Sequence, residues 1–385
     1  MLFAKLNDLS IGGKGAYGIA ASAVERKADL PTYLRITDIF DDGTLNLSEL
    51  KSVDAPNSDK YLLKPNDIVF ARTGGSTGRN YFYDGSDGVF VYAGFLIKFS
   101  IDPEKVNPKY VKYYCRSKQY NDWVQSFNTG STRGNINAQT FGNMEIPLPE
   151  RKQQDYLVSI LEPIDEKIKN NKQVNDNLQQ QAMSLYAEMF LNSSDINVTS
   201  GTLSDIAVIT MGQSPSGSSY NEDGVGEVFY QGRAEFGFRF PKRRLFTTEP
   251  KRMAEAGDVL LSVRAPVGDL NIAYERCCIG RGLGAIHSKT GHSSFILYTM
   301  FALRSQLDVF NGEGTVFGSI NRDALNAIPI DIPPVTEIDQ FEVVAHPIDE
   351  LIRANYEENC RLEAIRDSLL PKLMSGEIDV SAVQL

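Results

Sequence analysis

The chain is poor in histidine and cysteine, the side chains that most often carry chemistry or hold metal ions. Its 385 residues include three histidines and four cysteines. The cysteines are too few and too scattered for a disulfide framework, which predicts a reduced protein. No apolar run approaches the length of a membrane span, and residues 1–10 lack the basic and apolar blocks of a signal peptide. We therefore expect a cytoplasmic protein.

The sequence also lacks the motifs of the enzymes that act on DNA. Methyl transfer to a base would need an Asn/Asp-Pro-Pro-aromatic loop, and none is present. The glycine pattern of residues 13–18 resembles a dinucleotide loop, but no strand precedes it and no acidic partner follows, so we attribute it to chance. Cys277, Cys278, His287 and His292 are poor zinc candidates because adjacent cysteines rarely ligate one ion. We predict a chain that is not an enzyme and binds no metal or cofactor.

The chain also has no excess of positive charge. The formal net charge is −10, which argues against a protein that simply coats DNA, because phosphate contacts need cations. The charge is unevenly distributed, with a basic stretch at residues 233–252 and an acidic one at 337–379. The basic stretch could face nucleic acid while the acidic one faces water or another protein.

What the sequence does contain is an internal duplication. Residues 134–137, Gly-Asn-Ile-Asn, recur as Gly-Ser-Ile-Asn at 318–321, and the Pro-Ile-Asp-Glu of residues 163–166 recurs at 347–350. One constant spacing relates both pairs, and the register continues without a gap through the segment that follows. The spacing is too long for a solenoid repeat, so the chain consists of two copies of one domain-sized module.

Each copy ends in a segment with a heptad period. In the first copy, apolar or asparagine positions recur at alternating steps of four and three from Leu157 to Met189. The second copy repeats these steps from Phe341 to Leu373, with Arg366 as its one charged position. This pattern is typical of a coiled-coil seam. Four seam positions are asparagine, and we predict that they fix the register of an antiparallel helix pair: Asn171, Asn175, Asn355 and Asn359. Pro163 and Pro347 either belong to a first helical turn or lie in a helix that began earlier.

The remaining parts are rich in turns and short apolar runs. Residues 67–70, 90–92, 95–97 and 258–261 read as strands, and 110–120 as one helix. The predicted fold class is α+β, with two globular domains separated by two long antiparallel coiled-coil helices in an internal pseudo-two-fold repeat. The predicted boundaries are a first domain at 1–149, a central helical spacer at 150–192, a second domain at 193–334 and a C-terminal helical spacer at 335–385.

Polar and cationic side chains on glycine-rich turns suit the reading of DNA. Arginine can grip guanine and glutamine can grip adenine, while hydroxyls and lysine take phosphates. The candidates in the first copy are Lys14, Arg72, Ser76, Thr77, Arg79, Arg133 and Asn135. Those in the second copy are Gln213, Ser214, Gln231, Arg233, Arg239, Lys242, Arg243 and Arg264.

Several of these segments resemble a known family. They are residues 66–72 and 257–264, the Gly-x-Ile-Asn pairs, the proline-rich segments that begin at Ile146 and Ile328, and the tail 369–378. Over nearly the whole chain, the layout of two variable domains alternating with two repeated helices is similar to the specificity subunits of Type I restriction-modification enzymes. The repeated motifs are specific to that family, whereas the DNA-reading residues vary with the sequence that is read.

The resemblance implies a function. In that family each target-recognition domain reads one half of a split, asymmetric site in double-stranded DNA. The helices set the spacing and dock two modification (methyltransferase) subunits, and restriction subunits join to form the nuclease. S-adenosylmethionine, Mg²⁺ and ATP are then used by the partner subunits and not by this chain. Two alternatives remain open, a stand-alone restriction endonuclease with its own recognition domains and a scaffold whose variable domains bind protein.

Overall fold

The chain folds into two compact units, each held together by contacts among its own residues. The computed structural model describes residues 2–127, 134–192, 197–312, 318–375, 377 and 378. Unit 1 comprises Met1–Lys169 and Asn359–Leu385, and unit 2 comprises Asn170–Glu358. Each unit takes a part of two long helices, α4 (Arg151–Tyr186) and α9 (Val335–Ser375). Within the described ranges, no helix combines the length and the apolar character needed to cross a membrane.

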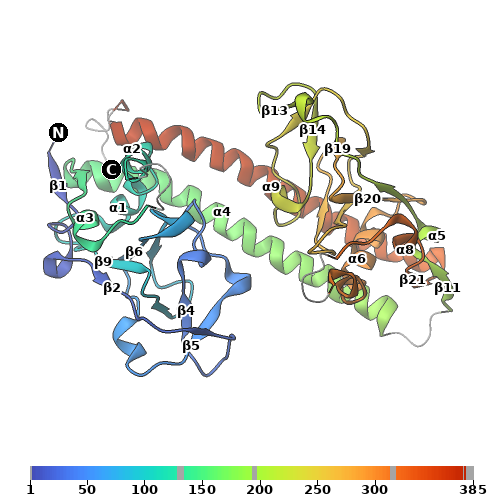
Figure 1. Cartoon of the computed structure of the whole chain (residues 1–385), viewed down its shortest axis with the longest axis horizontal. Helices are drawn as coiled ribbons and strands as arrows, with labels where there is room; N and C mark the ends of the chain where they lie inside the picture. The colour runs from blue at the N-terminus through green and yellow to red at the C-terminus, as the bar shows by residue number, and fades with distance from the viewer. Residues whose placement is uncertain (1, 128–133, 193–196, 313–317, 376, 379–385) are drawn as a thin grey trace. The chain divides into compact units, whose positions relative to one another are not determined.

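Unit 1 is built on two four-stranded sheets with the strand orders β2-β9-β6-β7 and β3-β5-β4-β8, and β1 pairs with β10 (Figure 1). Its strands are β1 (Phe3–Lys5), β2 (Ala16–Tyr17), β3 (Ala23–Val24), β4 (Thr32–Leu34), β5 (Lys51–Val53), β6 (Asp67–Ala71), β7 (Asn80–Tyr83), β8 (Phe90–Tyr92), β9 (Leu96–Ser100) and β10 (Glu145–Pro147). Its short helices are α1 (Pro108–Tyr114), α2 (Lys118–Gln125) and α3 (Ala138–Gly142).

Unit 2 repeats this plan, with sheets ordered β12-β20-β17-β18 and β13-β15-β14-β19-β16 and a ribbon of β11 and β21. Its strands are β11 (Thr199–Thr202), β12 (Ala207–Met211), β13 (Tyr220–Asn221), β14 (Glu227–Tyr230), β15 (Phe246–Thr247), β16 (Met253–Ala254), β17 (Val259–Ser262), β18 (Leu270–Ile272), β19 (Cys277–Ile279), β20 (Leu283–Ser288) and β21 (Pro329–Ile332). Its short helices are α5 (Leu203–Ile206), α6 (Ser293–Ala302), α7 (Arg304–Asp308) and α8 (Arg322–Asn326).

The two strand orders correspond one to one, apart from the additional β16. Both copies even share the same parallel pairing within their second sheet, between β4 and β8 in unit 1 and between β14 and β19 in unit 2. The α+β class and the duplication predicted from the sequence are therefore confirmed.

The repeated Asn/Gly-Asp pair forms the turn that starts the central strand of each first sheet. Asn66 and Gly257 have φ of 73° and 89°, a left-handed conformation that asparagine and glycine tolerate best. The carboxylates of Asp67 and Asp258 are buried, and each accepts a hydrogen bond of 2.8 Å from the amide three residues earlier. These contacts explain why this dipeptide occurs in both copies.

The Gly-x-Ile-Asn motif joins the core to a helix start. Ile136 and Ile320 are buried in the cores of units 1 and 2. The next residue in each copy, Asn137 or Asn321, caps α3 or α8 by accepting a hydrogen bond of 2.9 Å from a backbone amide of the first turn. An N-cap asparagine typically stabilises a helix by about 1 kcal/mol, so both motif residues have a structural role.

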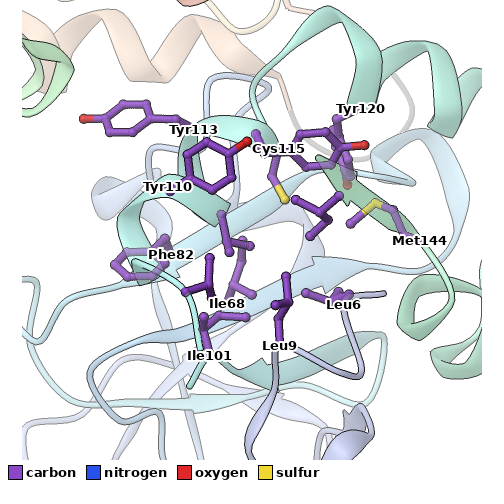
Figure 2. Packing of buried hydrophobic residues seen from close by; sticks show 14 of the residues in the cluster. Leu6, Leu9, Ile68, Phe82, Ile101, Tyr110, Tyr113, Cys115, Tyr120 and Met144 are labelled. Atoms are coloured by element: carbon purple, nitrogen blue, oxygen red, sulfur yellow. The ribbon is translucent and has the colours of Figure 1, made fainter. Parts of the chain in front are cut away.

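The first sheet of unit 1 is covered by a helical layer. Tyr110 and Cys115, from α1 and the residue that follows it, pack over Ile68 and Phe82 of β6 and β7 (Figure 2). The other face of the same sheet contributes to a second cluster with strands β4 and β8. Sequence reasoning placed one helix at 110–120, which is wrong, because the side chain of Ser117 caps a new helix, α2, after α1 has ended.

The long helices pack against each other in antiparallel fashion within each unit. In unit 1, Leu157 and Leu161 of α4 share the core with Leu370 and Leu373 of α9. In unit 2, Ala182 and Tyr186 of α4 meet Phe341 and Ala345 of α9. The heptad seam is thus confirmed as the buried stripe. Pro163 and Pro347 both lie inside helices that began earlier.

The seam asparagines are buried or partly buried. Asn171 and Asn175 are each 4% exposed. Within unit 2, Asn355 Nδ2 donates to Asn175 Oδ1 at 2.8 Å, and Asn171 Nδ2 donates to Glu358 Oε2 at 2.7 Å. A buried amide pair satisfies its polar atoms in one alignment only, which is the physical basis for the predicted register role.

The aspartate of the first Pro-Ile-Asp-Glu motif ties the globular part of unit 1 to its helices. Asp165 accepts from Lys112 Nζ at 3.0 Å, Tyr113 OH at 3.1 Å, Arg116 Nη1 at 2.9 Å and Arg366 Nη1 at 3.3 Å. Burial alone would raise the pKa of Asp165, but the surrounding cations outweigh it and lower the pKa to about 2. One carboxylate thus joins α1, α4 and α9.

The second copy of the motif has the same role in unit 2. Asp349 of α9 accepts from Tyr298 OH of α6 at 2.8 Å and from Arg239 Nη1 at 2.9 Å. Helices α1 and α6 occupy the same place in the two copies, so Tyr113 and Tyr298 are equivalent donors. We call Asp165 and Asp349 the anchor carboxylates.

The lowered pKa of Asp165 predicts a specific acid sensitivity. Its contribution to stability is complete above the ordinary carboxyl pKa and is lost as pH falls through the lowered value, so it disappears between about pH 4 and pH 2. Asp165→Asn should remove this part of the pH dependence. It should also reduce the free energy of unfolding of unit 1 at neutral pH by about 3 kcal/mol, because three partly buried cations remain without their carboxylate.

Amide hydrogen exchange of α1 across this pH range measures the effect in the full chain. Asp54→Asn, at an exposed position of the same unit, is the matched control and should leave exchange unchanged. Parallel pH profiles for Asp165→Asn and the wild type would contradict the anchor role.

Candidate nucleic-acid interface

Several loops of unit 1 meet beside the strands β4, β6 and β8. Their backbones are hydrogen-bonded to one another, so the loops form one connected platform. The bonds run from Ile19 N to Tyr92 O (3.1 Å), Ala93 N to Leu34 O (3.0 Å), Arg72 N to Phe95 O (3.1 Å) and Ile136 N to Arg72 O (2.9 Å).

The loops of unit 2 meet through the same set of bonds. They run from Gln213 N to Ile279 O (3.0 Å), Gly280 N to Tyr230 O (2.8 Å), Val263 N to Gly282 O (3.0 Å) and Ile320 N to Val263 O (3.1 Å). This match aligns the two loop sets residue by residue. Arg72 therefore corresponds to Val263, and Thr73 corresponds to Arg264.

Glycine allows the loops to approach so closely. A Cβ on Gly18 would lie 2.3 Å from Ala93 O, and one on the equivalent Gly212 would lie 2.1 Å from Gly280 O. Any side chain at these positions would separate the loops. The glycines thus hold each platform in a fixed shape, which favours recognition because little conformational entropy is lost on binding.

The platform of unit 1 presents an arginine stacked on a tyrosine. The Arg72 guanidinium lies 5.1 Å from the ring centroid of Tyr17, and Thr77 Oγ1 donates to Gly134 O at 2.9 Å. Lys14 and Asn135 are exposed on neighbouring loops. Sequence reasoning missed Tyr17, although its place three residues after the exposed Lys14 and its exposed ring suit a DNA contact.

Two other predicted residues of unit 1, Arg79 and Ser76, are less available for a DNA contact. Arg79 pairs with Asp41 at 2.7 Å, so part of its charge is already neutralised. Ser76 is only partly exposed, and its carbonyl accepts from Arg79 N at 2.9 Å. Arg133 lies outside the described residues.

The platform of unit 2 carries amide and guanidinium side chains. Gln213, Gln231 and Arg264 are exposed, and Ser214 Oγ accepts from Arg281 N at 3.2 Å. Sequence reasoning missed Arg281. The available signal was its position between two glycines, Gly280 and Gly282.

The basic stretch at 233–252 does not form a continuous cationic surface. Arg233 pairs with Asp269, and Arg243 pairs with Glu275 and stacks over Tyr274 at 5.7 Å. Lys242 is exposed. The carboxylates that come from other segments could not be assigned to these arginines from the sequence.

Arg239 was predicted to contact DNA, and the structure corrects this. Its side chain is 3% exposed, and Nη2 donates to Gln179 Oε1 of α4 at 3.0 Å while Nη1 binds the anchor carboxylate Asp349. A buried arginine that is paired and hydrogen-bonded holds the domain of unit 2 to its own part of the helix pair and cannot reach a duplex.

The residues considered for zinc are not gathered in one place. Cys277 and Cys278 are buried in β19, where burial raises the pKa of the Cys277 thiol to about 12. His287 instead contacts Asp258, and His292 contacts Asp339. Among the residues with described positions, no group of three or more histidine, cysteine or acidic side chains could hold a metal ion.

Comparison with known proteins identifies the duplicated module. The family model of the Type I restriction modification DNA specificity domain matches the chain twice, over residues 25–180 and 196–359. A putative type I restriction enzyme MjaX specificity subunit from Methanocaldococcus jannaschii is 30% identical over 83% of this chain and 80% of that protein. The type I restriction enzyme HindI specificity subunit from Haemophilus influenzae is 22% identical over 92% of this chain and 97% of that protein.

A solved structure shows the same fold. The crystal structure of a Type I restriction-modification system S subunit from M. genitalium has a TM-score of 0.59, with 16% identity over 97% of this chain and 95% of that one. Two specificity domains, each with its helical segment, define a duplicated DNA-recognition protein. The chain belongs to the specificity subunits of Type I restriction-modification systems. It is a non-catalytic recognition subunit and not a stand-alone endonuclease.

Substitution of Arg72 and of Arg239 should distinguish a DNA contact from a structural contact. Arg72→Ala should weaken binding of the target duplex by about 1–3 kcal/mol with little change in melting temperature. Arg239→Ala should instead destabilise unit 2 by about 3 kcal/mol, because the partly buried Asp349 loses its cation. Thermal unfolding and fluorescence-anisotropy titration of the same two samples check both expectations. A fall in melting temperature for Arg72→Ala as large as that for Arg239→Ala would contradict the assignment.

Proposed function

We propose that each unit reads one half of a split, asymmetric site in double-stranded DNA. In this proposal the chain brings two modification (methyltransferase) subunits and the restriction subunits to that site in the cytoplasm. Those partners use S-adenosylmethionine, Mg²⁺ and ATP, and this chain uses none of them. The proposal goes beyond the family membership, because it assigns a different half of the DNA site to each unit.

The supporting observation is that the two platforms have the same backbone and different side chains. The hydrogen-bond match pairs Ile19 with Gln213, Arg35 with Gln231, Thr73 with Arg264, Gly94 with Arg281 and Phe95 with Gly282. Base edges are distinguished by the donors, acceptors and apolar groups that face them. Two equal frames with unlike tips therefore suit the reading of two different base sequences.

Other polar groups of the two units fit contacts to the DNA backbone. Lys14, Asn135 and Lys242 are exposed, and lysine and amide side chains commonly bind phosphate oxygens. Ser76, Thr77 and Ser214 add hydroxyl groups on partly exposed residues. Such contacts would place each unit on the duplex without selecting a sequence.

Exchange of one domain tests the division of labour. Replacing residues 1–149 with the first domain of another specificity subunit should change one half of the methylated motif and leave the other half as it was. Sequencing of methylated DNA from cells that express the hybrid with its modification subunit gives the result. The reciprocal exchange of residues 193–334 is the control and should change the opposite half. If either exchange altered both halves, the units would not read independently.

The isolated chain should bind DNA without modifying it. Rigorously purified protein should shift a duplex that contains the target. It should transfer no methyl group from S-adenosylmethionine and cut no DNA with Mg²⁺, because in this proposal methyl transfer and cleavage belong to the partner subunits. Binding of duplex DNA separates this function from a protein-binding scaffold. Cleavage by the pure chain would restore the endonuclease alternative.

A further inference from the structure

The tight turn between β19 and β20 carries the arginine that the sequence analysis did not select. Leu283 N donates to Gly280 O at 3.0 Å, which closes a turn with Arg281 and Gly282 at its tip. Arg281 is exposed. Its backbone amide is fixed by Ser214 Oγ at 3.2 Å. The turn therefore presents a guanidinium from a backbone that is already ordered.

A second arginine lies beside this turn. Val263 directly precedes Arg264, and Gly282 directly follows Arg281. Val263 N donates to Gly282 O at 3.0 Å, which joins the two segments. Neither guanidinium forms an ion pair or a hydrogen bond with the side chains that the structure describes. Both cations are therefore available to an acceptor-rich ligand.

Two exposed glutamines lie on the loops that are hydrogen-bonded to this turn. Gly282 N donates to Gln231 O at 3.2 Å, and Gln213 N donates to Ile279 O at 3.0 Å, next to the start of the turn. The close packing of these loops leaves no room for a side chain at Gly282, where a Cβ would lie 2.7 Å from Gln231 O. Two glutamines and two arginines are thus held on one rigid frame.

Comparison with unit 1 indicates what this frame binds. The positions of Arg264 and Arg281 are occupied there by Thr73 and Gly94. A phosphate contact carries no sequence information, so nothing requires it to differ between the two copies. A contact that reads a base would differ between them, as these residues do.

We propose that Arg264 and Arg281 form the base-reading edge of unit 2 and bind the O6 and N7 acceptors of guanine in the half-site of that unit. Arginine is the side chain that most often makes this bidentate contact. The inference rests on the proposed function, because it names the contact through which unit 2 would read its half.

The test compares Arg281→Gln, Arg264→Gln and Arg281→Lys in the complex with the modification subunit. Arg276→Gln is the matched control. It removes the same charge at the opposite end of β19, where the arginine is exposed and paired with Glu227 and Glu255. The methylated motif in cells and the affinity for cognate and singly substituted duplexes over a salt series are measured for each variant.

Arg281→Gln and Arg264→Gln should each relax one guanine position in one half-site and weaken cognate binding about 10-fold, with little loss on the substituted duplex. Arg281→Lys should also relax that position, since lysine lacks the planar fork of arginine. Arg276→Gln should retain the wild-type motif.

Uniform weakening on all duplexes, with a smaller salt dependence and rescue by Arg281→Lys, would show a phosphate contact and overturn the inference. A motif unchanged in all variants would also overturn it while leaving the proposed function intact. A wild-type complex with no sequence preference would instead overturn the proposed function itself.

Discussion

The architecture of each unit depends on one partly buried carboxylate. Asp165 in unit 1 and Asp349 in unit 2 occupy the same place in the repeated helical segment, and each accepts hydrogen bonds from a tyrosine of the domain and from at least one cation. A carboxylate of this kind is costly to bury alone and stable only when its partners are present. The pairing therefore fixes the position of each domain on its own part of the helix pair. The loop platform of each unit belongs to the domain that is fixed in this way.

The duplication separates what is common from what differs. Turn residues such as Asn66 and Gly257, helix caps such as Asn137 and Asn321, and the close-packed Gly18 and Gly212 recur because the backbone requires them. The tips of the platforms are under no such requirement. Unit 2 has Arg281 at the position where unit 1 has Gly94, and the strands on either side are the same in both units. A recognition subunit can in this way change the bases that it reads while its fold stays the same.

The sequence was sufficient to predict the fold class, the repeat and the helix seam, because these depend on period and local backbone preference. It was not sufficient for the site. Arg239 and Arg243 belong to one basic stretch, yet one is buried against Asp349 and the other is exposed beside Glu275. Only the tertiary fold brings those carboxylates to them. Arg281 escaped notice for the same reason, since its neighbours Ser214, Gln231 and Val263 come from distant parts of the chain.

The central claim is that equivalent turns of the two units each face a different half of the DNA site. Site-specific photo-cross-linking tests it most directly, with the photoreactive side chain placed at Phe95 in unit 1 or at Arg281 in unit 2 of the complex on its cognate duplex. The account predicts that each position cross-links to bases of one half-site and that the two halves differ. Cross-links from both positions to the same half, or to neither half while the duplex remains bound, would contradict it.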